Sequence, residues 1–292
     1  MISVLKLFRL PLAFTAVADS LAGYLLTFTG GSADGRVVLC LALSSGGLYC
    51  FGMAMNDVAD RNRDRELYPK RPIPSGKLST LQAVGAAAGA LLVSFAAVVL
   101  APAESLPGRL AVWGGMVALI LAYDFGPKLP PLMGAIRALN LVLGAVAGQG
   151  LAVGKLPETA VMGVPLFVYV TGLTFVSTLE EGRIRRPVLF AWTGVMAAGA
   201  LLSVVMTSAF ADSWGTGHAW AFSISLVGWI GWRAWHAADR KGVMLLVRDG
   251  VAGIIVVDAT LLLSARSWEA GFSVLALLVP AIFLVAWFKK LA

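Results

Sequence analysis

Long and nearly uncharged apolar segments recur along the whole chain, and this feature restricts the possible folds more than any other. Each segment is close to the roughly 20 residues that an α-helix needs to cross a bilayer. The apolar residues are continuous rather than alternating, which favours helices over the strands of a barrel. The sequence therefore predicts an all-α fold, a polytopic transmembrane helical bundle.

Composition agrees with a membrane protein. Of the 292 residues, 59% are hydrophobic and 13% are charged, and the mean hydropathy is +0.83, whereas about a quarter of a soluble domain is charged. No loop is long enough to hold a soluble domain, so we expect one transmembrane domain over 1–292. Ten spans are predicted, with nine as the competing count because the fourth is short: 8–29, 37–56, 80–101, 109–123, 132–152, 160–179, 188–209, 218–236, 246–265 and 271–288.

The basic residues are distributed unevenly between the two sets of span ends. All but four of the 23 Lys and Arg residues lie at one set, the exceptions being Arg36, Arg109, Lys155 and Arg266. The positive-inside rule places the crowded ends in the cytoplasm. Ten spans then put both termini inside, and we expect a multi-pass protein of the cell inner membrane. The net charge of +7 is explained by topology and by contact with anionic membrane lipid, so no nucleic acid partner is expected.

The strongest chemical signal is the run N-D-V-A-D-R-N-R-D at 56–64, at the start of the largest predicted cytoplasmic loop, 57–79. No helix breaker interrupts its first half, so it can continue the second span. Asp57, Asp60 and Asp64 would then share one helix face. Such carboxylates need counter-ions, and Mg²⁺ held by carboxylates, water and substrate phosphate fits. Asn56 can add an amide oxygen or orient a carboxylate.

Two interpretations of these carboxylates are open from charge alone. The ordinary one is ion pairing with Arg61, Arg63 and Arg65 on a solvated helix end, although these arginines mostly face away at helical offsets. In the other, the basic loop that follows supplies charge for diphosphate oxygens, with Arg71 able to bind in a bidentate fork.

Further polar residues lie at predicted span ends or inside spans. Tyr123 and Lys128 can bind phosphate, or can belong to an interfacial belt. Arg137 and Asn140 are three residues apart in the fifth span, where a charge marks a function by default, although Arg137 could also extend to the interface. Glu180 and Glu181 are adjacent, so on a helix they point about 100° apart.

Two aspartates lie deeper in predicted spans. Asp19 belongs to the first span and Asp258 to the ninth. An unpaired carboxylate in the membrane is costly, so Asp19 is expected to face the interior of the bundle. A proton relay and a hydrogen-bonded structural role are both open for these residues.

The chain resembles the UbiA superfamily of membrane prenyltransferases. The resemblance rests on N-D-x-x-D-x-x-x-D at 56–64, R-P-I-P-S-G at 71–76 and the Tyr–Lys patch at 123–128, and it covers essentially the whole chain. The tracts A-D-x-x-A-G-Y-L at 18–25 and A-Y-D-F at 122–125 are most similar to the UbiA-like EboC branch. The resemblance implies nine core helices around a membrane-level cavity, so the tenth predicted helix would be an addition.

The resemblance also implies a function, namely Mg²⁺-assisted transfer of an isoprenyl group from its diphosphate to a small aromatic or hydroxyl acceptor. Metal ligands are then expected at Asp57, Asp60, Asp64, Glu180 and Glu181, substrate contacts at Asn56, Arg71, Tyr123, Lys128, Arg137 and Asn140, and catalytic roles at Asp60, Asp64, Lys128 and Glu181. The family's second acidic motif has several aspartates, where this chain has only two glutamates. The alternative is therefore a non-catalytic protein that binds or transports a lipid or metabolite.

Overall fold

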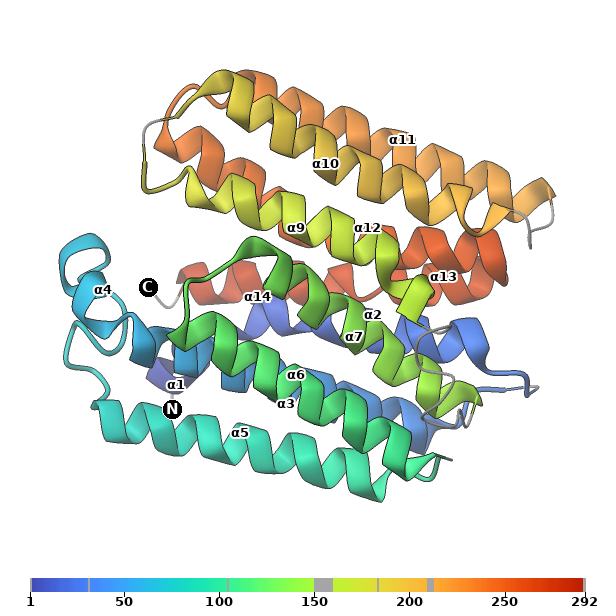
Figure 1. Cartoon of the computed structure of the whole chain (residues 1–292), viewed down its shortest axis with the longest axis horizontal. Helices are drawn as coiled ribbons and strands as arrows, with labels where there is room; N and C mark the ends of the chain where they lie inside the picture. Colours follow the sequence, from blue (N-terminus) through green and yellow to red (C-terminus); the bar gives the residue numbers. More distant parts are fainter. Residues whose placement is uncertain are drawn as a thin grey trace.

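The computed structural model describes residues 2–30, 32–103, 105–149, 160–182, 184–208 and 213–290, which form helices and contain no strand (Figure 1). The elements are α1 (Ile2–Leu7), η1 (Leu10–Leu12), α2 (Ala13–Thr27), α3 (Gly35–Ala59), α4 (Arg61–Leu67), α5 (Thr80–Leu100), α6 (Leu106–Phe125), α7 (Pro130–Gln149), η3 (Val161–Gly163), α9 (Val164–Thr178), α10 (Arg186–Val205), α11 (Ser213–His236), α12 (Arg240–Ala265), α13 (Trp268–Leu275) and α14 (Leu278–Lys290).

The predicted spans fall on these helices, which confirms the all-α prediction. Among the described residues, eight helical segments are long and apolar enough to cross a membrane. The other two predicted spans lie on α11 and α12. These helices are also long, but α12 carries Arg248, Asp249 and Asp258. The count of ten therefore stays a prediction. The last span is divided into α13 and α14, and residues 150–152 and 209 of two predicted spans lie outside the described residues.

The loop after α3 is helical in its first half, as its sequence predicted. The backbone N–H groups of Asp60 and Asp64 donate to the carbonyl oxygens of Asn56 and Asp60, each at 2.9 Å, so helical hydrogen bonding continues across the short break between α3 and α4. Residues 68–79 form turns rather than a helix. Gly76 has φ +75° there, a conformation that glycine adopts at little cost.

Glycines allow α2 and α7 to pack in close contact through the middle of the bundle. A Cβ placed on Gly144 would lie 1.7 Å from the carbonyl oxygen of Ser20, and one on Gly23 would lie 1.8 Å from the carbonyl oxygen of Leu141. Across the same contact, the hydroxyl of Thr27 donates to the carbonyl oxygen of Ala145 at 2.9 Å. Small residues that bring backbones together are a common way for helices to associate in lipid, where the hydrophobic effect does not drive their contact.

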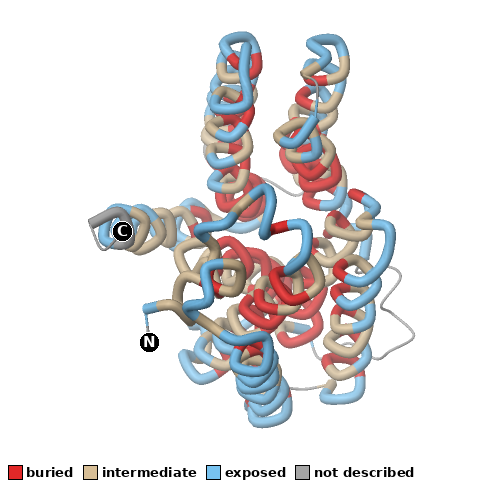
Figure 2. Tube along the Cα trace, turned by 90° about the vertical axis from the view of Figure 1, so that its left-hand side faces the viewer, coloured by how far each residue is buried: buried red, intermediate tan, exposed pale blue. Residues whose placement is uncertain are grey.

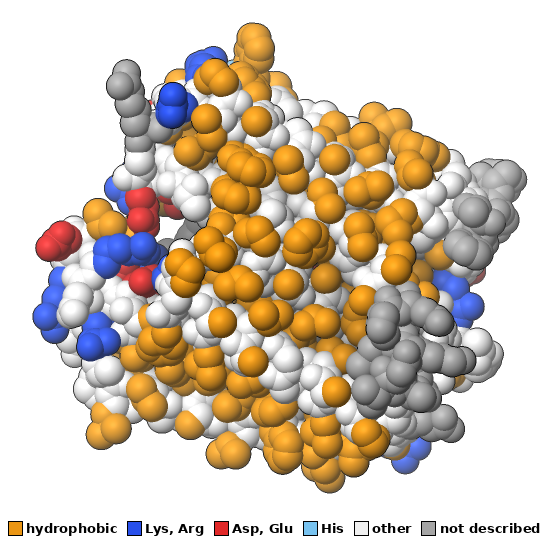
Figure 3. Space-filling view, in the orientation of Figure 1, with side chains coloured by type: hydrophobic (Ala, Val, Ile, Leu, Met, Phe, Trp, Pro, Cys, Tyr) orange, Lys and Arg blue, Asp and Glu red, His pale blue; other side chains and the backbone are white. Residues whose placement is uncertain are grey.

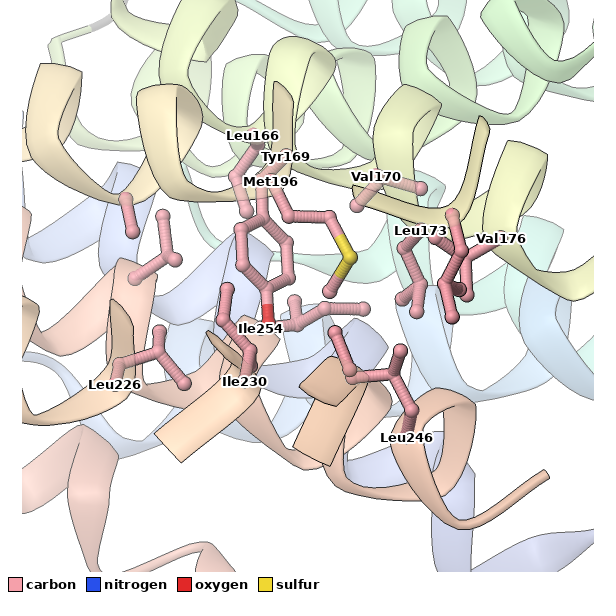
Figure 4. Packing of buried hydrophobic residues seen from close by; sticks show 14 of the residues in the cluster. Leu166, Tyr169, Val170, Leu173, Val176, Met196, Leu226, Ile230, Leu246 and Ile254 are labelled. Carbon is pink, nitrogen blue, oxygen red and sulfur yellow. The ribbon is translucent and has the colours of Figure 1, made fainter. Parts of the chain in front are cut away.

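A second packing centre joins α9, α10, α11 and α12 around Tyr169 and Met196, both fully buried (Figure 4). The Tyr169 hydroxyl donates to the carbonyl oxygen of Gly250 at 2.9 Å, which satisfies the one polar atom of this large side chain. Buried residues gather in the centre of the bundle, and exposed residues lie on its outer helix faces (Figure 2).

Charged side chains gather at one end of the molecule, beside α4, while hydrophobic side chains cover most of the face seen in Figure 3. We call this end, where α3, α6 and α9 finish and α7, α10 and α12 begin, the basic end. Arg36, Arg109 and Arg266 lie near the opposite ends of their helices, as their place in the sequence predicted. Arg183 and Lys155 lie outside the described residues.

Candidate functional site

A cavity of about 300 Å³ lies among α2, α3, α6, α7, α9 and α12 and extends to the basic end of the bundle. One face of α3 lines it with Ser45, Tyr49, Gly52 and Asn56, at the spacing of three and four residues that places side chains along one side of a helix. Most of the remaining lining is apolar. The cavity can therefore hold a hydrophobic group below a polar mouth.

The helical spacing predicted that Asp57, Asp60 and Asp64 share one face. Two of them, Asp57 and Asp64, lie together beside this mouth, where Arg9 and Asn56 line the cavity. Asp57 is 2% exposed and accepts a hydrogen bond from Arg9 at 2.9 Å. Asp64 is fully buried and pairs with Arg71 at 2.6 Å. The same Arg71 nitrogen, Nη1, is 3.7 Å from Asp57. Arg71 therefore bridges two buried carboxylates. Without it, the negative charge of Asp64 would be buried without a cationic partner among the described residues, whereas Asp57 would keep Arg9.

Asp60 has different partners from the other two aspartates. It pairs with Lys128 of the α6–α7 connection and with Arg63 at 3.2 Å. Of the three nearby arginines weighed as partners from sequence, Arg63 is the one that pairs with a carboxylate of the run. Arg61 donates to the backbone oxygen of Val58 instead. Two of the cationic partners of the carboxylates, Arg9 and Lys128, thus come from distant segments.

Asn56 and Asp124 join α3 to α6 on the cavity wall. The Asn56 amide donates to Asp124 Oδ1 at 3.1 Å, while Asp124 Oδ2 is buried and has no hydrogen-bond partner among the described residues. Tyr123 also lines the cavity. Sequence reasoning placed Asn56 and Tyr123 at the site but missed Asp124, whose position next to Tyr123 was the available signal.

Two of the cations at the mouth have left-handed backbone conformations. Arg9 has φ 46° and Lys128 has φ 51°, a region that costs a residue other than glycine about 1–2 kcal/mol. Such conformations persist where the surrounding structure enforces them, and they cluster at functional sites. Arg9 was expected only to mark topology, and its role at the mouth is visible only in the fold.

The segment after α9 closes one side of the mouth. Glu181 accepts a hydrogen bond from the Tyr68 hydroxyl at 3.2 Å and lies 3.4 Å from Arg63. Glu180 is half-buried, and its desolvation raises the pKa of this carboxyl above its usual value, although Arg240 opposes the shift. Both glutamates therefore lie near the first acidic motif. Glu181 contacts the motif through its ion pair with Arg63, whereas its hydrogen bond is to Tyr68 of the following loop.

Arg137 and Asn140 line the deeper part of the cavity. Arg137 donates to Asp19 at 2.8 Å, and its side chain is 8% exposed. It is therefore directed into the bundle, and the alternative that it extends to the interface is wrong. The Asn140 amide donates to Asp19 at 3.2 Å and accepts from Ser45 at 2.7 Å. The structure thus does not bring Arg137 and Asn140 into contact with the carboxylates at the mouth.

Comparison with known proteins identifies the family. The sequence profile of the UbiA prenyltransferase family matches residues 16–244, well over half of the chain. The chain belongs to the UbiA prenyltransferase family. Members of this family are multi-pass membrane prenyltransferases. The match confirms the family that the motifs at 56–64, 71–76 and 123–128 indicated.

Solved structures of UbiA homologues share the fold. An apo UbiA homologue from Aeropyrum pernix K1 is similar with a TM-score of 0.68 and 20% identity, over 88% of this chain and 96% of that one. A UbiA homologue from Archaeoglobus fulgidus, bound to GPP and Mg²⁺, has a TM-score of 0.62 and 14% identity, over 94% of this chain and 99% of that one. These likenesses establish the UbiA-like bundle.

One curated relative is a 4-hydroxybenzoate octaprenyltransferase of Paracidovorax citrulli, 32% identical over 117 residues. The match spans 38% of this chain and 38% of the length of that relative. It therefore supports family membership and does not identify the substrate of this chain.

The donors at the mouth of this UbiA protein suit Mg²⁺ by their chemistry, since Mg²⁺ prefers hard oxygen ligands. Asp64 Oδ1 is buried and has no hydrogen-bond partner among the described residues, so it is available to a ligand. No three acidic, His or Cys side chains in the described part of the chain converge as a metal site, because cations hold the carboxylates. The set therefore fits an ion that arrives with phosphate oxygens better than one bound by protein alone.

Proposed function

We propose that this chain moves an isoprenyl group from its diphosphate to a small aromatic or hydroxyl acceptor, with Mg²⁺ as cofactor. One observation carries the proposal. Asp57, Asp60 and Asp64 meet the cations Arg71 and Lys128, next to Asn56 and Tyr123, which line the basic end of a largely apolar cavity. This arrangement offers ligands for a metal–diphosphate head and space for a hydrocarbon chain. The homologue structure with bound GPP and Mg²⁺ supports the same substrate class.

The cations of the mouth would hold the diphosphate. Arg71 and Lys128 would exchange their carboxylate partners for diphosphate oxygens, with Arg71 able to bind through two nitrogens. The freed carboxylates would then hold the cation, and Mg²⁺, when bound, neutralises charge on the leaving diphosphate. Arg9 would keep Asp57 in place during this exchange. Preorganised charge of this kind is usually the largest single contribution to such catalysis.

The apolar wall would protect the reacting carbon from water. As the bond between C1 of the isoprenyl group and the diphosphate oxygen breaks, Tyr123 would stabilise the allylic cation through its ring face. The acceptor's carbon or oxygen then bonds to C1. Its proton passes to Asp64 or Glu181, the carboxylates that we expect to act as bases, while Asn56 orients Asp124 on the wall.

The finer site assignments remain proposals of the same kind. We propose Asp57, Asp60, Asp64, Glu180 and Glu181 as metal ligands, and Asn56, Arg71, Tyr123, Lys128, Arg137 and Asn140 as substrate contacts. Arg137 and Asn140 lie deeper than the mouth, so they would contact the acceptor or the isoprenyl chain rather than the diphosphate. Catalytic roles are proposed for Asp60, Asp64, Lys128 and Glu181.

Orientation and subfamily are also proposed rather than established. We propose that 1–292 form one domain in the inner membrane, with ten spans and with both termini and the basic end facing the cytoplasm. We also propose that the chain belongs to the EboC branch, on the basis of the tracts at 18–25 and 122–125. A reporter fused after Ala292 tests the topology, since an extracytoplasmic signal would contradict ten spans.

Turnover of labelled isoprenyl diphosphates of several chain lengths, with Mg²⁺ and candidate acceptors, tests the enzyme proposal. Asp60→Asn should abolish turnover. Asp249→Asn is the matched control, because Asp249 is also ion-paired, to Arg233 at 2.6 Å, but neither residue belongs to the acidic run at 56–64 or pairs with it. Retained Mg²⁺-dependent diphosphate binding with no turnover for any chain length and acceptor would refute the transferase proposal.

That same outcome would support a second function, binding or transport of a lipid or metabolite without chemistry. Two observations favour it as the alternative. The carboxylates of the first motif are neutralised by the chain's own cations, and the second acidic segment provides only Glu180 and Glu181. Absence of both binding and turnover would contradict both functions.

A further inference from the structure

Two fully buried carboxyl groups lie side by side in the middle of the bundle, away from the acidic mouth. They belong to Asp19 of α2 and Asp258 of α12, both 0% exposed. Arg137 of α7 adjoins them and reaches the wall of the cavity. Carboxyl groups at this depth in a membrane protein are expensive and require partners.

The hydrogen bonds of Asp19 are complete, whereas those of Asp258 are not. Asp19 Oδ1 accepts from Arg137 at 2.8 Å, and Asp19 Oδ2 accepts from the Asn140 amide at 3.2 Å. Among the described residues, no N–H or hydroxyl group donates to either oxygen of Asp258. The group that faces Asp258 is the carboxyl of Asp19.

Charge counting gives the same asymmetry. The charged groups that act on the pair are each other and Arg137, so two carboxyls share one guanidinium. From the other packed helices the nearby titratable groups are Tyr49 of α3, which is close to Arg137, and Tyr169 of α9, whose hydroxyl donates to the backbone of α12. Neither supplies a positive charge, so ionising both carboxyls would leave one buried negative charge without a partner.

We propose that Asp19 and Asp258 form a buried proton-binding site, in which a single proton on Asp258 donates to the carboxylate of Asp19. The proton gives Asp258 the hydrogen bond that no other group provides, and it leaves one carboxylate for one guanidinium. Adjacent carboxyls that share a proton titrate as a unit. This site does not depend on the proposed transferase function, because Asp19 and Asp258 lie outside the mouth, although Arg137 and Asn140, which donate to Asp19, are also proposed substrate contacts.

Asp258 then acts as a positioning residue. Its proton holds the Asp19 carboxylate, Asp19 holds Arg137, and Arg137 forms part of the cavity wall. If the proton were lost, two negative charges would compete for one guanidinium, and the position of Arg137 on the wall would change. The cavity wall is therefore linked to proton occupancy at a site that the cavity does not reach.

Infrared spectroscopy of the purified protein in nanodiscs at neutral pH tests the site directly. The wild type should show the C=O stretching band of protonated carboxylic acid, shifted in D₂O. Asp258→Asn should remove one component of that band, while any contribution from other protonated carboxyls stays. Asp249→Asn, which alters an ion-paired aspartate of the same helix, should leave it unchanged. Retention of the full band in Asp258→Asn would overturn the proposal.

Thermal unfolding gives a second readout that separates the two aspartates. Asp258→Asn keeps a neutral donor beside Asp19 and should unfold within about 3 °C of the wild type, whereas Asp19→Asn leaves Arg137 unpaired and should unfold roughly 10 °C lower. The wild-type midpoint should fall as alkaline pH removes the proton, and that slope should be smaller in Asp258→Asn. Equal losses in the two variants, or a midpoint that depends on Na⁺ rather than on pH, would refute a proton site.

Discussion

Replacing Arg71 by Gln should destabilise the protein in the absence of Mg²⁺, because Arg71 serves two buried carboxylates. Its Nη1 lies 2.6 Å from Asp64 and 3.7 Å from Asp57. With an effective dielectric constant of about 20, these distances correspond to gross attractions of about 6 and 4–5 kcal/mol. The side chain is 25% exposed, and desolvation opposes the pairing, so we expect a net loss of about 2–4 kcal/mol.

A loss of this size should lower the unfolding midpoint by about 5–10 °C. Asp64 would lose its only cationic partner among the described residues, while Asp57 would keep Arg9. The assay is thermal unfolding in detergent or nanodiscs with EDTA. Arg61→Gln is the matched control, because Arg61 is exposed and donates to a backbone oxygen rather than to a carboxylate.

Added Mg²⁺ should then separate the two variants further. In Arg71→Gln the carboxylate of Asp64 is free to bind a divalent ion and that of Asp57 is held by Arg9 alone, so Mg²⁺ should recover part of the lost midpoint. In the wild type, Mg²⁺ without diphosphate must displace Arg71 and should change the midpoint less. Equal midpoints of the Arg71 and Arg61 variants in EDTA would refute the stabilising role of the ion pairs. Equal Mg²⁺ shifts would refute the metal assignment.

Three other predictions follow from single residues. Lys128→Gly should be more stable than Lys128→Ala by about 1 kcal/mol in thermal unfolding, because glycine relieves the φ of 51°, and both should bind labelled isoprenyl diphosphate less tightly. Gly144→Ala should lower the midpoint strongly or prevent folding, whereas Gly115→Ala, whose Cβ would meet only Leu139 at 3.9 Å, should fold normally. Burial raises the pKa of Glu180, so the folded state holds this proton more tightly than the unfolded state does, and the free energy of unfolding falls as pH rises. Glu180→Gln should therefore be more stable than the wild type above that pKa and equally stable in acid. Unfolding measured across pH checks this.

Helical periodicity accounts for the part of this fold and site that could be predicted. Apolar runs indicated the helices. The spacing of Asp57, Asp60 and Asp64 indicated one shared face, and Arg71 joins two of them, Asp57 and Asp64. Asp60 shows the limit of that reasoning. Its position after the end of α3 allows it to pair with Lys128, which is 68 residues away in sequence, and no local pattern encodes such a contact.

Long-range partners explain the rest of what sequence missed. Arg9 meets Asp57 across 48 residues, and a basic residue before a first span is ordinarily explained by topology alone. Arg137 was recognised as unusual inside a span, but its partner Asp19 lies 118 residues away. Each charge could be predicted to need a counter-ion, whereas the choice of partner depends on how α2, α3 and α7 pack.

The pairing of Asp57, Asp60 and Asp64 with cations of the chain has a consequence for turnover under the proposed function. When substrate binds, the diphosphate replaces the carboxylates as partner of the cations, and the metal replaces the cations as partner of the carboxylates. The number of buried charges without a partner therefore stays nearly constant. When the product diphosphate leaves, Arg71 and Lys128 return to their aspartates, so the protein itself competes with the departing group. Substrate affinity is thereby moderated, and release is assisted by contacts already present in the resting protein.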